Sequence, residues 1–266
     1  MAEALPGLGA IGEDRLLDGR LILRQPRKGH RAGSDAVLLA ASLPDLGEGP
    51  LLDIGAGVGT IGLAAALAQP ALRVVLLERD PELAGLATEN AALNGLAERV
   101  VVVTGDIAGP AAALGLAPAS FAGVAMNPPY YPPRGHRASP VPNRRAAHLD
   151  EAGLEPWLRA ARRLLKPRGQ LLVVHRAEAL PELLAALATG FGAVMITPVH
   201  AQADQPAIRI LVAATLGSKK PAALLPALVL HSPEGGFTLE AEALHRGRAR
   251  LPMAEPDSPP PQRPAQ

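Results

Sequence analysis

Short apolar runs alternate with helical stretches between about residues 49 and 215. Seven of these runs are predicted to be strands, at 51–54, 73–78, 99–103, 121–126, 170–175, 193–199 and 207–215. Apolar residues at helical spacing predict helices near 59–68, 81–94, 154–165 and 178–188. Near-continuous apolar runs such as LRVVLL and QLLVVH are typical of parallel strands covered on both faces. The alternation therefore predicts an α/β fold with helices on both faces of one sheet.

The end of the predicted sheet differs from its beginning. The last two strands are joined by residues 200–206, a loop too short for a crossover helix. Antiparallel neighbours can be joined by such a loop, whereas parallel neighbours cannot. We therefore expect a seven-stranded, mostly parallel sheet that ends in a C-terminal antiparallel hairpin.

Three segments lie outside this alternation. Residues 1–14 are expected to be a flexible N-terminus. Residues 15–48 contain a short strand pair around 20–25 and a helix that begins near Ser34 or Asp35. Residues 252–266 are rich in proline and polar residues, a composition typical of disorder. One domain spanning residues 15–251 is the expected organisation.

Composition excludes several classes of protein. The 266 residues include no cysteine, which excludes disulfides, thiol nucleophiles and cysteine-zinc sites. His148 and His175 have no partner at metal-ligand spacing, so no metal site is expected. The N-terminus lacks the pattern of a signal peptide, and no apolar run is long enough to span a membrane. We expect a cytoplasmic protein that contacts no membrane, and we expect a monomer.

A glycine-rich turn follows the first predicted strand. Asp53 precedes Gly55, Gly57 and Gly59, and a helix follows. Glycines in such a turn let the backbone approach a ligand closely, but dinucleotide-binding enzymes share this feature. The carboxylate of Asp53 would repel a pyrophosphate, whereas it could hold the cationic amino group of a methionine. This combination favours S-adenosylmethionine as the cofactor.

Acidic residues also end the next two strands. Glu78, which precedes Arg79, ends the second strand and could accept hydrogen bonds from ribose hydroxyls. Asp106 follows the third strand and could accept a hydrogen bond from an adenine amine, with Ile107 packing against the ring. Ligands of open α/β sheets bind at these carboxyl ends. Glu78, Arg79, Asp106 and Ile107 are therefore candidate cofactor-binding residues.

The sequence Asn127-Pro128-Pro129-Tyr130 after the fourth strand is the most specific motif in the chain. The side-chain oxygen of Asn127 and the backbone carbonyl of Pro128 could accept both N–H bonds of a planar amine. These bonds would draw the nitrogen toward tetrahedral geometry and aim its lone pair at a methyl donor. The prolines stiffen the loop, and Tyr130 offers a face on which the acceptor could stack. The motif predicts methyl transfer to an exocyclic amine, and Asn127 is expected to contact the cofactor as well.

These motifs carry a resemblance to a known family. The chain from about residue 15 to residue 237 resembles the bacterial tRNA1(Val) adenine-N6-methyltransferases, on the glycine-rich turn, the Asn-Pro-Pro-Tyr motif, residues 25–40 and residues 204–209. The resemblance implies a Rossmann-like class I methyltransferase fold in which residues 15–48 cover the cofactor cleft. It also implies that Gln25, Gly33 and Asp35 lie near the methionine end of the cofactor. The acceptor it implies is N6 of adenine in tRNA.

Local clusters of basic residues fit an RNA partner, although the net charge of the chain is only +1. Contacts to phosphates supply much of the affinity for RNA. The candidates for such contacts are Arg24, Arg27, Lys28, His30, Arg31, Arg134, Arg137, Lys219 and Lys220. Whether they face RNA depends on their converging on the side of the molecule that carries Tyr130.

Alternatives remain for the acceptor and for the activity. A glutamine side chain of a protein and N2 of guanine in rRNA are also planar exocyclic amines, so the motif alone does not choose among them. A protein that keeps the fold and binds RNA without catalysis is a third possibility. The presence of Asp53, Glu78, Asn127 and Tyr130 together argues against it.

Overall fold

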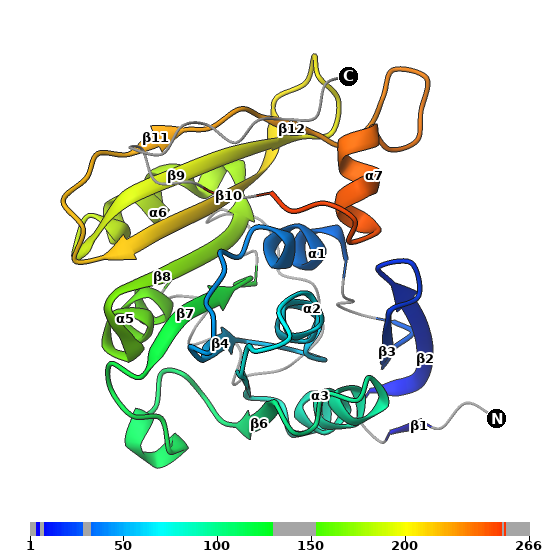
Figure 1. Ribbon diagram of the computed structural model, residues 1–266, viewed down its shortest axis with the longest axis vertical. Coiled ribbons are helices and arrows are strands. Elements are labelled where there is room, and N and C mark those ends of the chain that lie inside the picture. The colour runs from blue at the N-terminus through cyan, green and yellow to red at the C-terminus, as the bar shows by residue number, and fades with distance from the viewer. Residues whose placement is uncertain (1–3, 6–7, 29–32, 130–152, 252, 254–266) are drawn as a thin grey trace, which may run out of the picture.

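The main sheet has the predicted architecture (Figure 1). The computed structural model describes residues 4–5, 8–28, 33–129, 153–251 and 253. All seven expected strands are present, as β4 Leu51–Ile54, β5 Val74–Glu78, β6 Val100–Thr104, β7 Phe121–Met126, β8 Leu165–Arg176, β9 Phe191–His200 and β10 Ala207–Leu216. Two short strands, β11 Ala223–Leu224 and β12 Leu228–Val229, pair with β9 and bring the sheet to nine strands. The expected α/β class is confirmed, and the strand count is two higher than predicted.

The order of the strands reverses at β4. Along the sheet the order is β11-β9-β10-β8-β7-β4-β5-β6, so the chain runs outward from β4 to β6 and then returns to place β7 on the other side of β4. β4 is parallel to both β5 and β7, and β10 is antiparallel to both β8 and β9. The predicted hairpin at the end of the sheet is therefore confirmed. The switch point lies between β4 and β7, where open α/β sheets bind ligands.

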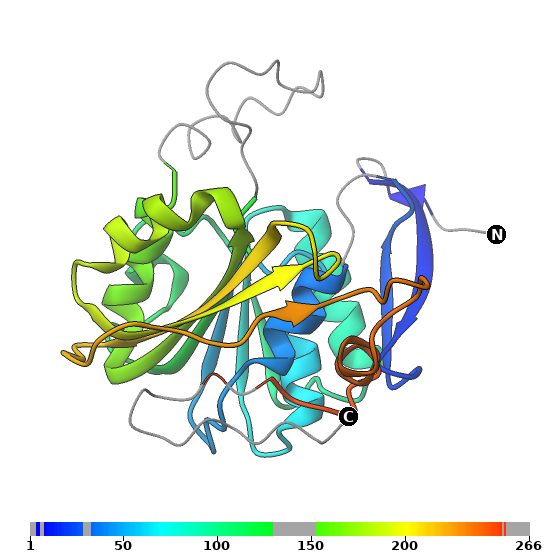
Figure 2. The same ribbon diagram turned by 90° about the horizontal axis from the view of Figure 1, so that it is seen from above.

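Helices cover both faces of the sheet (Figure 2). One apolar cluster joins the sheet to α1 Ser34–Ala41, α2 Thr60–Ala68, α3 Pro81–Leu93 and α7 Leu239–His245. A second cluster joins the opposite face to α5 Glu155–Leu164 and α6 Leu180–Leu187, with the short helices η1 Ala111–Leu114 and η2 Ala177–Ala179. Successive residues of one strand alternate between the clusters, as Leu51 and Leu52 do. Both faces are therefore apolar, as the sequence of the strands predicts.

Both ends of α3 carry residues that commonly begin and end helices. The side chain of Asp80 accepts hydrogen bonds from the backbone N–H groups of Glu82 at 2.9 Å and Leu83 at 3.3 Å, and Pro81 occupies the first helical position. Gly95, with φ of +67°, ends the helix in the left-handed conformation.

The N-terminal residues form a separate small sheet of β1 Ala4–Leu5, β2 Gly9–Leu16 and β3 Leu21–Pro26. The expectation that residues 1–14 are flexible is wrong for residues 9–14, which belong to β2. Ile11 explains the difference, because it is buried against Val58 and Leu86 in a third apolar cluster. The proline-rich tail expected to be disordered, residues 252–266, lies outside the described residues except for Met253.

Asn90 of α3 and Asn94, the C-cap of that helix, attach this small sheet to the domain. Asn90 accepts from the N–H of Arg24 at 2.7 Å and donates to its carbonyl at 3.1 Å. Asn94, one turn later, accepts from the N–H of Ile22 at 2.9 Å and donates to its carbonyl at 2.7 Å. The two side-chain amides therefore pair with the edge of β3 as a neighbouring strand would. Asn90 also donates to the carbonyl of Val58, within the glycine-rich turn, at 3.0 Å.

Replacing Asn90 with alanine is expected to lower the free energy of unfolding by about 2–3 kcal/mol. The side chain is fully buried, and its loss leaves the backbone groups of Arg24 and the carbonyl of Val58 without this partner. Urea denaturation measures the change. Glu89→Ala is the matched control, because Glu89 contributes only an exposed ion pair to Arg24 and should cost less than about 1 kcal/mol. Equal losses in the two variants would contradict the role given to Asn90.

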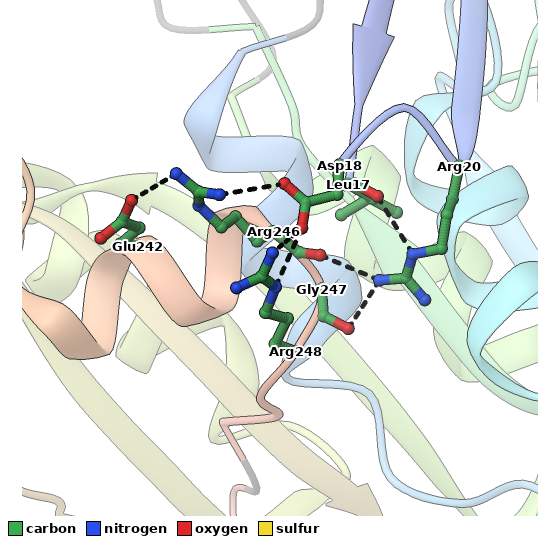
Figure 3. A network of polar contacts seen from close by, with 7 residues as sticks. All are labelled: Leu17, Asp18, Arg20, Glu242, Arg246, Gly247 and Arg248. Carbon is green, nitrogen blue, oxygen red and sulfur yellow. Dashed lines mark hydrogen bonds and ion pairs between the residues drawn. The ribbon is translucent and has the colours of Figure 1, made fainter.

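A polar network ties the C-terminal segment to the turn between β2 and β3 (Figure 3). Arg20 donates to the carbonyls of Arg246 at 2.9 Å and Gly247 at 2.7 Å. Asp18 pairs with Arg246 and with Arg248. The segment after α7 is thereby held against the hairpin turn.

Candidate functional site

The register of the sheet brings the predicted site residues to one edge. Ile54, the last residue of β4, pairs with Leu77 of β5 and Met126 of β7. The next residues along these three strands are Gly55, Glu78 and Asn127, which therefore lie side by side. Asp106 lies two residues beyond Thr104, the partner of Glu78. The glycine-rich turn, the acidic residues and the Asn-Pro-Pro motif share the carboxyl edge at the switch point.

The glycine-rich turn needs glycine for conformational and steric reasons. Gly55, Gly57 and Gly59 have φ of +71°, +56° and +91°, in the left-handed region that residues with side chains rarely adopt. A β-carbon on Gly55 would also lie 2.7 Å from the ring of Trp157. The N–H groups of Gly55 and Ala56 donate to the carbonyl of Leu77 at 2.8 and 3.1 Å. The turn is thus held between β5 and α5.

Asp53 lies beneath this turn and is completely buried. Its Oδ2 accepts from the N–H of Gly62 at 3.0 Å, which caps the first turn of α2. Its Oδ1 has no hydrogen-bond partner among the described residues. Burial, with a smaller contribution from the charge of Glu78, raises the pKa of Asp53 to about 7, although the Gly62 hydrogen bond acts in the opposite direction. An unpaired oxygen of a buried carboxyl group is costly, and a cationic donor would satisfy it.

The side chain of Glu78 is buried and fixed by the backbone around it. Its Oε2 accepts from the N–H of Gly57 at 2.8 Å and its Oε1 from the N–H of Asp80 at 2.9 Å. The adjacent Arg79 is exposed. On the next strand, Asp106 is exposed and accepts from the N–H of Ala108 at 2.8 Å, whereas Ile107 is buried in the second apolar cluster. The two carboxylates therefore differ in exposure while sharing one edge.

The Asn-Pro-Pro motif follows β7 directly. Asn127 is half-buried, Pro128 is buried and Pro129 is exposed. Tyr130 lies outside the described residues, as does the rest of the loop up to residue 152. The described part of the motif is the asparagine–proline corner itself.

The three candidates implied by the N-terminal resemblance lie in different surroundings. Gln25 is buried in β3 and donates to Asp14 of β2 at 2.6 Å. Gly33 is exposed and is the N-cap of α1, with no side-chain cap. Asp35, in the first turn of α1, pairs with Arg209 of β10 at 2.9 Å. Gln25 and Asp35 thus each form a polar contact with another element.

The basic candidates do not converge on one edge. Arg27 and Lys28 are exposed and follow β3, whose order against α3 directs them toward the carboxyl edge. Lys219 and Lys220 follow β10, which runs antiparallel to β8, so they lie at the opposite edge. Arg24 is paired with Glu89 at 2.7 Å. His30, Arg31, Arg134 and Arg137 lie outside the described residues.

Two residues beside the site were not singled out for it by the sequence. Trp157 is buried in the core, and its ring packs directly on Gly55. Asn90 bonds to the turn at Val58 from α3. Asn90 and Asn94, four positions apart at the end of a predicted helix, are a usable signal for the contact of Asn90. No pattern in the sequence indicates the contact of Trp157 with Gly55.

Comparison with known proteins assigns the family. Residues 31–202 match the family model described as the methyltransferase small domain. The chain belongs to the methyltransferase small domain family. A relative from Aeromonas hydrophila, named tRNA1(Val) (adenine(37)-N6)-methyltransferase, is 31% identical over 212 residues, which cover 78% of this chain and 85% of the relative. The resemblance drawn from the motifs is thereby confirmed.

Two further matches show how much of this chain resembles known proteins. A Porphyromonas gingivalis protein of the same name is 32% identical over 160 residues, and the match spans 58% of this chain but only 61% of that relative. A solved structure from Agrobacterium tumefaciens, described as a predicted O-methyltransferase, has a TM-score of 0.70 at 30% identity and covers 82% of this chain and 98% of its own. The methyltransferase fold is therefore shared along most of the described domain.

The residues at the edge fit the cofactor that methyltransferases of this kind use. The unpaired oxygen of Asp53 suits an ammonium group, and Glu78 and Asp106 supply acceptors on the two neighbouring strands. Within the described residues, no group of three or more histidine, aspartate or glutamate side chains could hold a metal ion. In the same part of the chain, no helix is long and apolar enough to cross a membrane.

Proposed function

We propose that this chain is an S-adenosylmethionine-dependent methyltransferase that methylates N6 of adenine in tRNA. The observation that carries the proposal is the position of Asn127 and Pro128 beside Gly55, at the ends of neighbouring strands β7 and β4. An acceptor held at the asparagine–proline corner would lie next to the ligand of the glycine-rich turn. The names of the relatives, which specify adenine 37 of tRNA1(Val), support the substrate.

The cofactor would be held by residues of three strands. The turn at Gly55–Gly59 would approach it closely, the carboxyl group of Asp53 would pair with its ammonium group, and Glu78 would accept from its ribose. Asp106 and Ile107 would contact the adenine ring, the first by a hydrogen bond and the second by packing. When bound, S-adenosylmethionine supplies a methyl group on a sulfonium, which an amine can attack directly.

The asparagine–proline corner prepares the acceptor nitrogen. The lone pair of an aromatic amine is delocalised into the ring, so the free amine is a poor nucleophile. The side-chain oxygen of Asn127 and the carbonyl of Pro128 would each accept one N–H bond, which favours tetrahedral nitrogen. Pro128 is buried and its φ is fixed, so its carbonyl is already in position before the acceptor binds. Little free energy is then needed to keep the acceptor oxygen in place during the reaction.

An amine fits this corner better than a hydroxyl group does. The Agrobacterium tumefaciens structure is described as a predicted O-methyltransferase. A hydroxyl group offers one proton, which a base must remove, whereas an NH2 group offers two N–H bonds to two acceptors. The motif therefore favours nitrogen, and glutamine or guanine N2 remain the competing acceptors.

The RNA would approach the carboxyl edge of the sheet. Arg27 and Lys28 are exposed toward that edge and would contact phosphates, whereas Lys219 and Lys220 would not, because they lie at the opposite edge. We propose that the protein acts as a monomer in the cytoplasm, where tRNA is present.

Product analysis tests this proposal. The protein is incubated with methyl-labelled S-adenosylmethionine and, separately, with bulk tRNA, rRNA, DNA or protein, and each product is digested and identified. We expect label in N6-methyladenosine from tRNA, with a KM for tRNA that rises steeply between low and high salt. Label in methylated glutamine or N2-methylguanosine would replace the proposed acceptor. No transfer to any acceptor would favour the non-catalytic RNA-binding alternative.

A further inference from the structure

An ion pair joins the first turn of α1 to strand β10 of the main sheet. The Nε of Arg209 in β10 lies 2.9 Å from the Oδ2 of Asp35, across 174 positions of sequence. Both side chains are largely buried, with exposed fractions of 28% and 24%. Partial burial reduces the screening by solvent, so this pair should contribute more than an exposed pair.

A bulge in β10 orients Arg209 toward α1. The register with β9 shifts between Ala207 and Arg209, so Ile208 is an extra residue, and it is exposed. Arg209 then falls on the same face as Leu211, which belongs to the apolar cluster that contains α1. Its Nη1 donates to the carbonyl of Ile208 at 2.9 Å, which fixes the guanidinium group against the bulge itself.

The pair lies at the edge that carries the candidate site. Arg209 is the register partner of Arg176, the last residue of β8, so it lies at the carboxyl end of the parallel strands. α1 packs beside α2, and α2 begins at the glycine-rich turn. The start of α1 lacks a side-chain cap, because its N-cap is Gly33. The contact with Arg209 therefore anchors a helix end that its own sequence leaves uncapped.

We propose that Arg209 is a positioning residue for cofactor binding, which acts by fixing Asp35 and the start of α1 at the carboxyl edge. This rests on the proposed function, in which the glycine-rich turn at the start of α2 holds the cofactor, and on the family resemblance, which implies that Gly33 and Asp35 lie near its methionine end. The role is confined to binding. Arg209 changes the affinity for S-adenosylmethionine and leaves the rate of methyl transfer at saturating cofactor unchanged, because Asn127 and Pro128 follow β7 and α1 forms no part of the asparagine–proline corner.

A charge series at position 209 tests the role. Arg209→Lys keeps the positive charge, Arg209→Gln removes it, and Arg209→Glu places a like charge opposite Asp35. Calorimetry measures the dissociation constant for S-adenosylmethionine, and hydrogen–deuterium exchange of the free full-length protein measures protection of residues 34–41. Arg159→Gln is the matched control, because Arg159 makes an exposed ion pair with Glu155 on α5, on the other face of the sheet.

The dissociation constant should rise about twofold in Arg209→Lys, about fivefold in Arg209→Gln and more than tenfold in Arg209→Glu, with faster exchange at the start of α1 in the same order. The control should match the wild type in both measurements. Equal effects of all three substitutions, unchanged exchange, or a fall in kcat at saturating cofactor would overturn the proposal. Calorimetry and hydrogen–deuterium exchange are both carried out without RNA. A failure to methylate tRNA would therefore contradict the proposed substrate and not the role of Arg209.

Discussion

Asn127→Ala is expected to lower the rate of methyl transfer about 100- to 1,000-fold, measured at saturating S-adenosylmethionine and saturating RNA. The substitution removes one of the two acceptors at the asparagine–proline corner, so the amine is bound without being drawn toward tetrahedral geometry. The loss of one preorganised polar group from an active site commonly has this magnitude. Single-turnover kinetics with labelled cofactor measures the rate and separates it from product release.

Cofactor binding should separate this role from a structural one. The ammonium and ribose contacts would be made by Asp53 and Glu78, and both side chains are held by backbone N–H groups and not by Asn127. Calorimetry on Asn127→Ala should therefore give a dissociation constant within about threefold of the wild type. Asn127→Asp keeps an oxygen in the same position and should retain more activity than the alanine variant. A complete loss of cofactor binding in Asn127→Ala, or equal activities of the two variants, would contradict the acceptor role.

The main sheet could be predicted because each strand carries its own signal. β5 and residues 171–174 of β8 are almost continuously apolar, and the short loop 200–206 leaves only an antiparallel connection between β9 and β10. The N-terminal sheet could not be predicted in the same way. Its docking depends on Asn90 and Asn94, which lie 66 and 72 positions from the backbone groups they bind. Side-chain bonds across such a separation leave no local periodicity.

Some parts of the candidate site could likewise be predicted from the sequence, and others could not. Glycines after β4 and acids after β5 and β6 could be placed, because parallel strands bring their carboxyl ends to one edge. The position of Lys219 and Lys220 relative to the other basic residues could not be predicted from the sequence. The direction of β10 decides their position. The contact of Trp157 with Gly55 depends on how α5 packs, which its sequence alone does not specify.

The affinity for S-adenosylmethionine is expected to rise with pH up to about pH 7 and then to level off. Burial raises the pKa of Asp53 to about 7 in the free chain, so the carboxyl group is largely protonated below that pH. Pairing with the ammonium group of the cofactor requires the carboxylate. Binding below pH 7 must therefore release a proton, and the dissociation constant should fall by up to about tenfold per pH unit there. Calorimetry in buffers of different ionisation enthalpy measures both quantities.

Asp53→Asn removes this dependence. The variant should bind S-adenosylmethionine about 100-fold more weakly at pH 7.5, because the ammonium group meets a neutral amide in a buried site, and its affinity should be flat between pH 5.5 and 7.5. Asp45→Asn is the matched control, since Asp45 is exposed and only accepts from the N–H of Gly47 in a loop. It should reproduce the wild-type profile. A flat wild-type profile would contradict the direct pairing of Asp53 with the cofactor.

Stability of the free chain should change with pH in the opposite sense. A carboxyl group whose pKa is higher in the folded chain than in the unfolded chain holds its proton more tightly when folded. The contribution of Asp53 to the free energy of unfolding is therefore fully present below about pH 4, falls as pH rises toward 7, and levels off above it. Asp53→Asn should flatten this part of the profile in urea denaturation. The same buried carboxyl group thus makes the free domain less stable at the pH where it binds its cofactor best, because the oxygen that destabilises the empty site is the one the ligand satisfies.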